Sequence, residues 1–161
     1  MRRTVGIAAG IVGAVVIAAF TVSCGSSTAP GAKTYVSAMS PANELPAKTT
    51  TGTGITTFVD NGSEIDWTMS LTGMTGVFAS HIHLGSATVN GGPVIFNLFI
   101  PNGTNTGTLN GLVGSGTITN ANNVNISLDS LRVLFNNGNA YVNVHTTANQ
   151  GGEIRAQVAL K

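Results

Sequence analysis

SEIDWTMSL, residues 63–71, decides the fold class of this chain, because apolar and polar side chains alternate along it. Its apolar side chains are Ile65, Trp67, Met69 and Leu71, and the polar ones between them are Glu64, Asp66, Thr68 and Ser70. A period of two is typical of a β-strand with one buried and one solvated face. We therefore predict a strand here that packs its apolar face against a core.

The same period recurs on both sides of this stretch. In 93–100 it places Val94, Phe96, Leu98 and Ile100 on one face, and in 153–160 it places Ile154, Ala156, Val158 and Leu160 inside and Glu153, Arg155 and Gln157 outside. Further candidate strands are 34–39, 54–60, 112–119 and 140–146. Asn- and Gly-rich turns, such as DNGS at 60–63, separate many of these segments. The pattern predicts an all-β fold, a Greek-key β-sandwich of about seven or eight strands.

One segment departs from this period. In SLDSLRVLFNNG, residues 127–138, the apolar residues Leu128, Leu131, Leu134 and Phe135 are spaced by three and four. This spacing predicts one short helix near 127–137, capped at its start by Ser127 or Ser130 and ended by Gly138.

The amino-terminal residues have the pattern of a bacterial export signal. MRR is followed by an apolar run from Val5 to Phe20 and then by TVSC, which contains the only cysteine, Cys24. This arrangement resembles a lipoprotein signal, with an ordinary secretory signal or an uncleaved anchor as alternatives. We expect a signal peptide at 1–23, a lipidated Cys24, a flexible tether at 24–33 and one domain at 34–161. The protein is then anchored by lipid to a bacterial membrane in the cell envelope, facing the periplasm or the exterior.

Charge excludes one class of partner. Only 8% of the 161 residues are charged, and the formal net charge of +1 becomes −1 once Arg2 and Arg3 are removed with the signal. No basic patch remains, so we expect no binding to nucleic acid.

The three histidines of the chain are the candidate functional residues. In VFASHIHL, residues 77–84, the alternation directs Phe78, Ser80, Ile82 and Leu84 to the core and His81 and His83 away from it. In AYVNVHT, residues 140–146, Val142 and Val144 take the core face, and His145 takes the outer face together with Tyr141 and Asn143. If the two strands are neighbours, three imidazoles meet over the sheet and form a site suited to copper or zinc. The alternative is that the histidines only hydrogen-bond to loops.

The segment after His145 is TTANQGGEIR, residues 146–155, which predicts a turn around Asn149 into the last strand. We expect Asn143, Asn149, Glu153 and Arg155 to surround the histidines or fix this loop. Glu153 and Arg155 form either a buried pair that fixes the loop or an exposed pair of little energetic weight.

Three segments of the chain resemble the CHRD domain, a module named from chordin and found in bacterial secreted proteins. They are ANELP at 42–46, ASHIHLGSATVNGGPVIFNL at 79–98 and AYVNVHTTANQGGEIRAQV at 140–158. The resemblance covers residues 34–160 and names a module whose biochemical activity is poorly defined.

A second resemblance concerns the order of the histidines. A His-x-His strand, a later Val-His and a Gly-Gly turn into the last strand are similar to copper/zinc superoxide dismutases. This likeness implies copper ligation by His81, His83 and His145. It also implies departures, because the chain has no bridging histidine, no further histidines for zinc and no disulfide pair. The arginine that guides superoxide falls at Glu153, where a carboxylate would repel an anion.

These observations lead to three hypotheses. The first is a metal-binding domain of the cell envelope, with copper ahead of zinc. The second is a metal-free extracellular binding or adhesion module. The third is an enzyme, either a weak dismutase or a zinc-dependent hydrolase. The sequence favours it least, because no nucleophile–base pair and no paired catalytic carboxylates lie near the histidines.

Overall fold

Alternating segments of the chain become strands of two sheets. The computed structural model describes residues 31–99, 101, 107–122 and 125–161, and the predicted signal peptide, Cys24 and most of the predicted tether lie outside them. The described elements are β1 (Lys33–Met39), the 3-10 helix η1 (Pro41–Asn43), β2 (Thr53–Asp60), β3 (Ile65–Thr75), β4 (Val77–Leu84), β5 (Val94–Phe99), β6 (Thr108–Ile118), α1 (Leu128–Asn136), β7 (Ala140–Thr146), β8 (Ile154–Gln157) and β9 (Ala159–Leu160).

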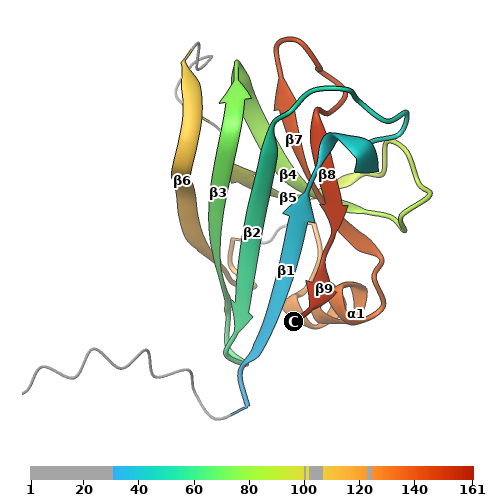
Figure 1. The fold of residues 1–161 in the computed structure, drawn as a ribbon. Coiled ribbons are helices and arrows are strands. Elements are labelled where there is room, and N and C mark those ends of the chain that lie inside the picture. Colours follow the sequence, from blue (N-terminus) through green and yellow to red (C-terminus); the bar gives the residue numbers. More distant parts are fainter. Residues whose placement is uncertain (1–30, 100, 102–106, 123–124) are drawn as a thin grey trace, which may run out of the picture.

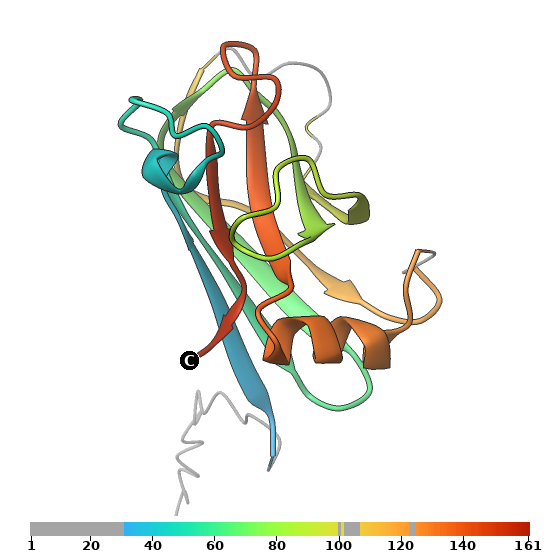
Figure 2. The ribbon, with the colours of Figure 1, turned by 90° about the vertical axis from the view of Figure 1, so that its right-hand side faces the viewer.

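The strands form two antiparallel sheets that face each other (Figures 1 and 2). One sheet has the order β6-β3-β2-β1-β9 and the other has the order β5-β4-β7-β8. The chain crosses from β3 to the pair β4–β5 and returns as β6 beside β3. It then crosses again to place β7 beside β4, which is the Greek-key type of connection. The all-β sandwich predicted from the sequence is confirmed.

The inner faces of the two sheets carry the apolar residues that the alternation selects. Ile65, Met69 and Leu71 are fully buried, and Trp67 is nearly so. Val142 and Val144 of the opposite sheet belong to the same core. Each such side chain removes apolar surface from water and contributes about 1.5–3 kcal/mol to folding.

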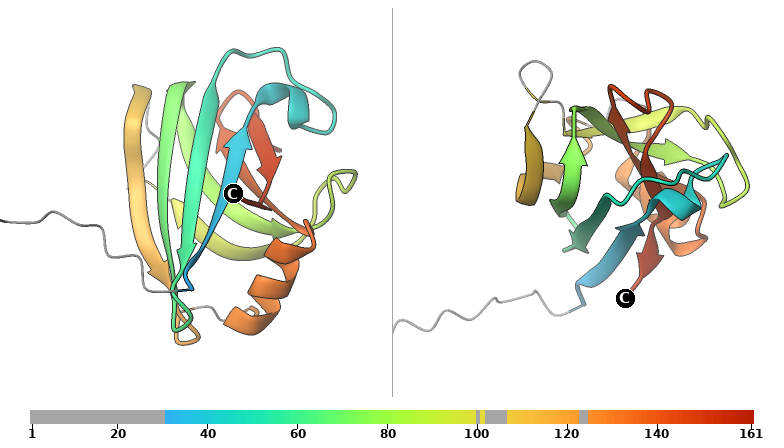
Figure 3. Two further views of the ribbon diagram at one scale, coloured as in Figure 1. Left: turned by 60° about the horizontal axis from the view of Figure 1, so that its bottom comes forward. Right: turned by 45° about the horizontal axis from the view of Figure 1, so that its top comes forward.

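The predicted helix is present and closes one end of the sandwich (Figure 3). The Ser127 hydroxyl accepts a hydrogen bond from the backbone N–H of Ser130, so Ser127 is the N-cap. Phe135 packs its ring against Tyr35 and Phe58, with ring centroids 5.3 and 5.0 Å away. Among the described residues, no helix is both long enough and apolar enough to cross a bilayer.

The last predicted strand, 153–160, is two strands in the structure. The chain leaves one sheet after β8, buries Val158 between the sheets and joins the other sheet as β9. This crossing raises the number of described strands to nine. It also leaves Leu160 60% exposed, so the expectation of an inward Leu160 is wrong.

Register shifts correct two further face assignments. The β4–β5 ladder shifts after Ser80 and after Ile82, so β5 buries Ile95 and Leu98 and exposes Val94, while Phe96 is partly buried against the core. The β4–β7 ladder shifts between Val77 and Ala79. A bulge of this kind reverses the side that a residue faces, which strict alternation does not anticipate. The predicted position of Ile100 lies outside the described residues.

Candidate metal centre

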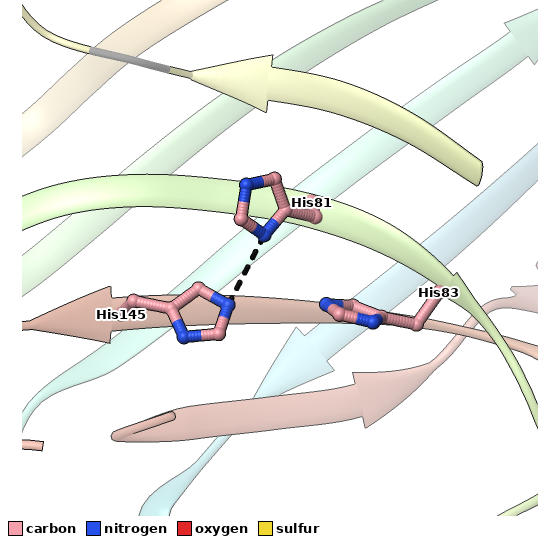
Figure 4. A group of neighbouring side chains, drawn as sticks. All are labelled: His81, His83 and His145. Atoms are coloured by element: carbon pink, nitrogen blue, oxygen red, sulfur yellow. Dashed lines mark hydrogen bonds between the residues drawn. The ribbon is translucent and has the colours of Figure 1, made fainter. Parts of the chain in front are cut away.

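The two histidine-bearing strands are hydrogen-bonded neighbours. In the β4–β7 ladder Ala79 lies opposite His145, and His81 lies opposite Asn143. Ile82 and Val142, directly opposite each other, point into the core, so the residues at alternate positions point to the outer face. His81, His83 and His145 therefore converge over one sheet (Figure 4), and the predicted cluster is confirmed.

The nitrogens of the cluster are close enough to approach one ion. One nitrogen from each ring lies within 4.8 Å of the other two. His81 Nδ1 and His145 Nε2 are 3.1 Å apart. Because imidazole–metal bonds are about 2.0–2.1 Å long, two ligand nitrogens lie at most about 4 Å apart. The His81–His145 pair already meets this limit. For any wider pair, a displacement of the ring nitrogens by less than about 1 Å is sufficient to meet it.

Backbone carbonyl groups fix the tautomers of two of the rings. His83 Nδ1 lies 2.7 Å from the carbonyl oxygen of Gly92, and His145 Nδ1 lies 2.8 Å from that of Gln150. A carbonyl oxygen only accepts, so both rings donate from Nδ1 and keep a lone pair on Nε2. This outer-shell hydrogen bond is the one that metal-binding histidines usually make.

His83 and His81 present their nitrogens differently. His83 Nε2 is buried and has no hydrogen-bond partner among the described residues, an uncommon state for a buried polar atom. An ion at the cluster would satisfy it. His81 Nδ1 donates to the bare Nε2 of His145 in the metal-free protein. It could act as a ligand only with its proton on Nε2.

Burial keeps all three imidazoles neutral. Desolvation, followed by the charges of His145 and His83, lowers the pKa of His81 from 6.5 to about 4. Desolvation also lowers the pKa of His83 and that of His145, although the hydrogen bonds to Gly92 and Gln150 act in the opposite direction. A neutral imidazole is the form that binds a metal, so the cluster is ready for an ion at neutral pH.

The outer face is covered around His83, whereas His81 and His145 are partly exposed. The ring of Tyr141 stacks on that of His83, with centroids 4.9 Å apart and an interplanar angle of 5°. The Tyr141 hydroxyl accepts a hydrogen bond from the N–H of Gly92, whose carbonyl receives His83 Nδ1. Gly92 has no room for a side chain, since a Cβ there would run into the Leu84 carbonyl. The sequence analysis did not predict these contacts of Tyr141 and Gly92 with His83. The Gly-Gly pair at 91–92 is the only feature of the sequence that indicates them.

Asn143 links the sheet to the segment after β1. Its amide donates to the Glu44 carboxylate over 2.6 Å, and both side chains are buried. Burial is the largest influence on Glu44 and raises its pKa, against the attraction of Arg155. Glu44 belongs to the ANELP segment, whose role the sequence did not reveal.

Glu153 and Arg155 do not pair with each other in the described structure. The Glu153 carboxylate accepts hydrogen bonds from the Thr146 hydroxyl and the Asn149 amide, over 2.6 and 3.2 Å. Arg155 lies elsewhere, with its guanidinium 3.7 Å from the centre of the Tyr141 ring. Both side chains are buried, and Arg155 lies on the outer face predicted for it, opposite Asn143 and against Tyr141. The carbonyl oxygens of Val89 and Ser86 take the hydrogen bonds of Arg155.

The predicted core position of Phe78 is also wrong. The alternation places it in the core, but its ring lies 5.9 Å from that of His145, on the outer face. The register shift between Val77 and Ala79 explains this position, because the extra residue reverses the side that Phe78 faces. Phe78 thereby covers one side of His145.

A Greek-key sandwich with a histidine cluster on the outer face of one sheet is the class that the fold and the site define. The CHRD domain model matches residues 35–158, and the chain belongs to the CHRD domain family. Comparison with curated proteins and with solved structures gave no match.

Proposed function

We propose that this domain binds a transition-metal ion, copper ahead of zinc, through His81, His83 and His145. The observation that carries the proposal is the convergence of three nitrogens, two of which carry a lone pair because backbone carbonyls fix their tautomers. The lone pair of His145 Nε2 accepts a hydrogen bond from His81 in the metal-free protein. The buried Nε2 of His83, which has no hydrogen-bond partner among the described residues, supports the proposal, because most buried polar atoms in proteins are paired.

The donor set supports copper ahead of zinc. In the described cluster it consists of imidazoles alone, without a carboxylate or a thiolate. Imidazole nitrogen suits both metals, and for a given set of donors Cu(II) binds more tightly than Zn(II). The order of the histidines along the chain, similar to that in copper/zinc superoxide dismutases, favours the same metal. Three protein ligands leave one position for water or a small molecule.

The cell envelope is the proposed setting, for reasons of sequence alone. The segment that ends in TVSC resembles a lipoprotein signal, and lipidation at Cys24 would attach the domain to a bacterial membrane. A domain that captures copper outside the cytoplasm is the function that we propose for the whole protein.

Titration of the purified domain with Cu(II) and with Zn(II), followed by calorimetry, tests the proposal. We expect one ion per chain and tighter binding of copper. The double variant His81→Gln/His145→Gln keeps polar side chains of similar size and should bind at least 100-fold more weakly. Asn97→Ala is the matched control, since Asn97 is an exposed residue on β5 opposite His81. Equal, weak binding by all three proteins would overturn the proposal.

A groove favours a second candidate function, a metal-free binding module. It has a volume of about 440 Å³ and lies between the ANELP segment, Ala87 and β8. Arg155, Gln157 and Asn43 supply its polar groups, and alanine and leucine side chains supply the rest. If the titrations show no bound metal, this concave surface is the site that the module hypothesis uses.

A further inference from the structure

We infer that the three-histidine centre binds Cu(I) in preference to Cu(II), because a buried arginine beside the cluster disfavours the higher charge. This inference rests on the proposed copper-binding function and deepens it by naming the oxidation state of the ion.

The ligands of the proposed site bring no negative charge. Among the described residues the cluster consists of three histidines, and each imidazole is neutral when it binds a metal. The charge of a bound ion is therefore not compensated by its own ligands. His83 is buried, and the cost of charge in a poorly solvated place rises steeply with its size.

Arg155 is buried near this site and is only 2% exposed. Its guanidinium stacks on one neighbour of the site, Tyr141, which in turn stacks on His83. The two stacking distances, 3.7 and 4.9 Å, keep a permanent positive charge within roughly 9 Å of the His83 ring. The same charge contributes to the lowered pKa of His83, so it already opposes added positive charge at this ring.

The hydrogen-bond partners of Arg155 do not neutralise its positive charge. Its hydrogen bonds run to the carbonyl oxygens of Val89 and Ser86 and to the side-chain oxygen of Gln157, all of which are neutral. The ion pairs found among the described residues lie elsewhere, between Arg132 and the carboxylates of Asp60 and Asp129.

Glu44 is the carboxylate that attracts Arg155, but it does not bond to it directly. It receives the amide of Asn143. Burial raises the pKa of Glu44 and the attraction of Arg155 lowers it, so this carboxylate offsets part of the positive charge of Arg155 without forming a direct ion pair with it. Arg155, which forms no ion pair among the described residues, thus lies beside a site made of neutral ligands, and its positive charge favours the ion of lower charge.

The experiment measures the affinities of Cu(I) and Cu(II) separately for the folded domain, by competition with a chelator of known affinity for each ion, with ascorbate and exclusion of oxygen for Cu(I). We expect the native protein to bind Cu(I) more tightly. Arg155→Gln should lower the ratio of the Cu(I) to the Cu(II) affinity about tenfold. That is the effect of one charge at roughly 10 Å with an effective dielectric constant of about 20. For a one-electron couple it equals a fall of about 59 mV in reduction potential.

Two further variants separate charge from packing. Arg155→Lys keeps the charge and loses the planar stack, so it should keep the native ratio, and its affinities remain informative if Arg155→Gln fails to fold. Lys33→Gln removes an exposed charge at the start of β1 and should leave the ratio unchanged. Tighter binding of Cu(II) by the native protein, or an equal loss in Arg155→Lys and Arg155→Gln, would overturn the inference while copper binding stands. Absence of copper binding in the native protein would instead remove the proposed function.

Discussion

At the scale of the residue, the three imidazoles are chemically similar but held in different ways. His83 and His145 each donate to a backbone carbonyl, whereas His81 donates to another member of the cluster, the Nε2 of His145. Under the proposed function, His81 is thus the residue that would change its protonated nitrogen on metal binding. It also has the most strongly lowered pKa of the three, about 4.

This lowered pKa predicts how the stability of the metal-free protein depends on pH. In the unfolded chain His81 takes up a proton near its ordinary pKa of 6.5, but in the folded protein only near 4. Between these values the unfolded state binds more protons, so the free energy of unfolding falls as the pH falls. Urea unfolding in the presence of a chelator, from pH 7 to pH 4.5, measures this slope.

The variant His81→Asn isolates the contribution of this residue. It should reduce the slope by up to about one proton, because its side chain does not titrate. Glu44 acts in the opposite direction, since its pKa is raised, but it does so equally in both proteins. Identical slopes for the native protein and the variant would contradict the prediction.

The sequence revealed the direction of these side chains but not their surroundings. Alternation was sufficient to place His81, His83 and His145 on one face, because the side chains of a strand point alternately to its two sides. It could not show that loops cover this face. The burial of Tyr141 and Arg155 depends on the 85–92 loop, whose path is not encoded in any strand period.

At the scale of the element, the loop between β7 and β8 depends on one glycine. Gly152 has a φ of +130°, and a Cβ there would collide with the Asn143 amide and the Glu44 carboxylate. The backbone at this point therefore leaves no space beside the buried Asn143–Glu44 hydrogen bond. The strand pattern predicted a turn here but not this contact with a segment about a hundred residues earlier.

We predict that Gly152→Ala destabilises the fold by about 2–4 kcal/mol, through backbone strain and displacement of the two polar side chains. Gly151→Ala is the matched control. Gly151 has open space at its Cβ position and no positive φ, so it should change stability by less than about 0.5 kcal/mol. Urea unfolding of both variants checks the difference, and equal losses would show that Gly152 has no special role.

Register shifts in the strand ladders are the reason why some side chains could not be assigned to the correct face from the sequence. β3 follows a strict period across residues 65–71, and its core residues were predicted correctly. The β4–β5 ladder shifts after Ser80 and after Ile82, and the β4–β7 ladder shifts between Val77 and Ala79, and Phe78, Val94 and Ile95 were assigned to the wrong sides. Leu84, also predicted to face the core, is 38% exposed. A bulge adds one residue to one strand only, so it becomes visible when the partner strand is known.

At the scale of the whole molecule, a metal ion at the cluster would join two strands that are distant in sequence. His81 and His145 are 64 residues apart. An ion that binds only the folded protein stabilises it by mass action, about 2.7 kcal/mol at a free concentration 100 times the dissociation constant.

This linkage predicts a higher melting temperature in the presence of copper. We expect a rise of roughly 10 °C for a domain of this size, reversed by a chelator. Thermal unfolding followed by circular dichroism measures the rise. The His81→Gln/His145→Gln double variant should show none, and a rise of the same size in that variant would mean that copper acts elsewhere on the protein.

The path of the chain through the sandwich has a consequence for attachment. β1 starts beside Asp60, and the N–H of Lys161 reaches the carbonyl of Thr34, so both terminal strands lie at one pole of the molecule (Figure 1). The ladder between Val77 and Thr146 ends at the other pole, and the imidazoles lie along the outer face of β4 and β7, with His145 beside Ala79 near that end and His83 beside Tyr141 near the opposite end. A lipid at residue 24 would thus attach the pole where β1 begins, and the histidine cluster on the side face of the sandwich would remain away from the attachment point. Immobilising the domain on a sensor chip through either end should, for the same reason, leave ion uptake unhindered.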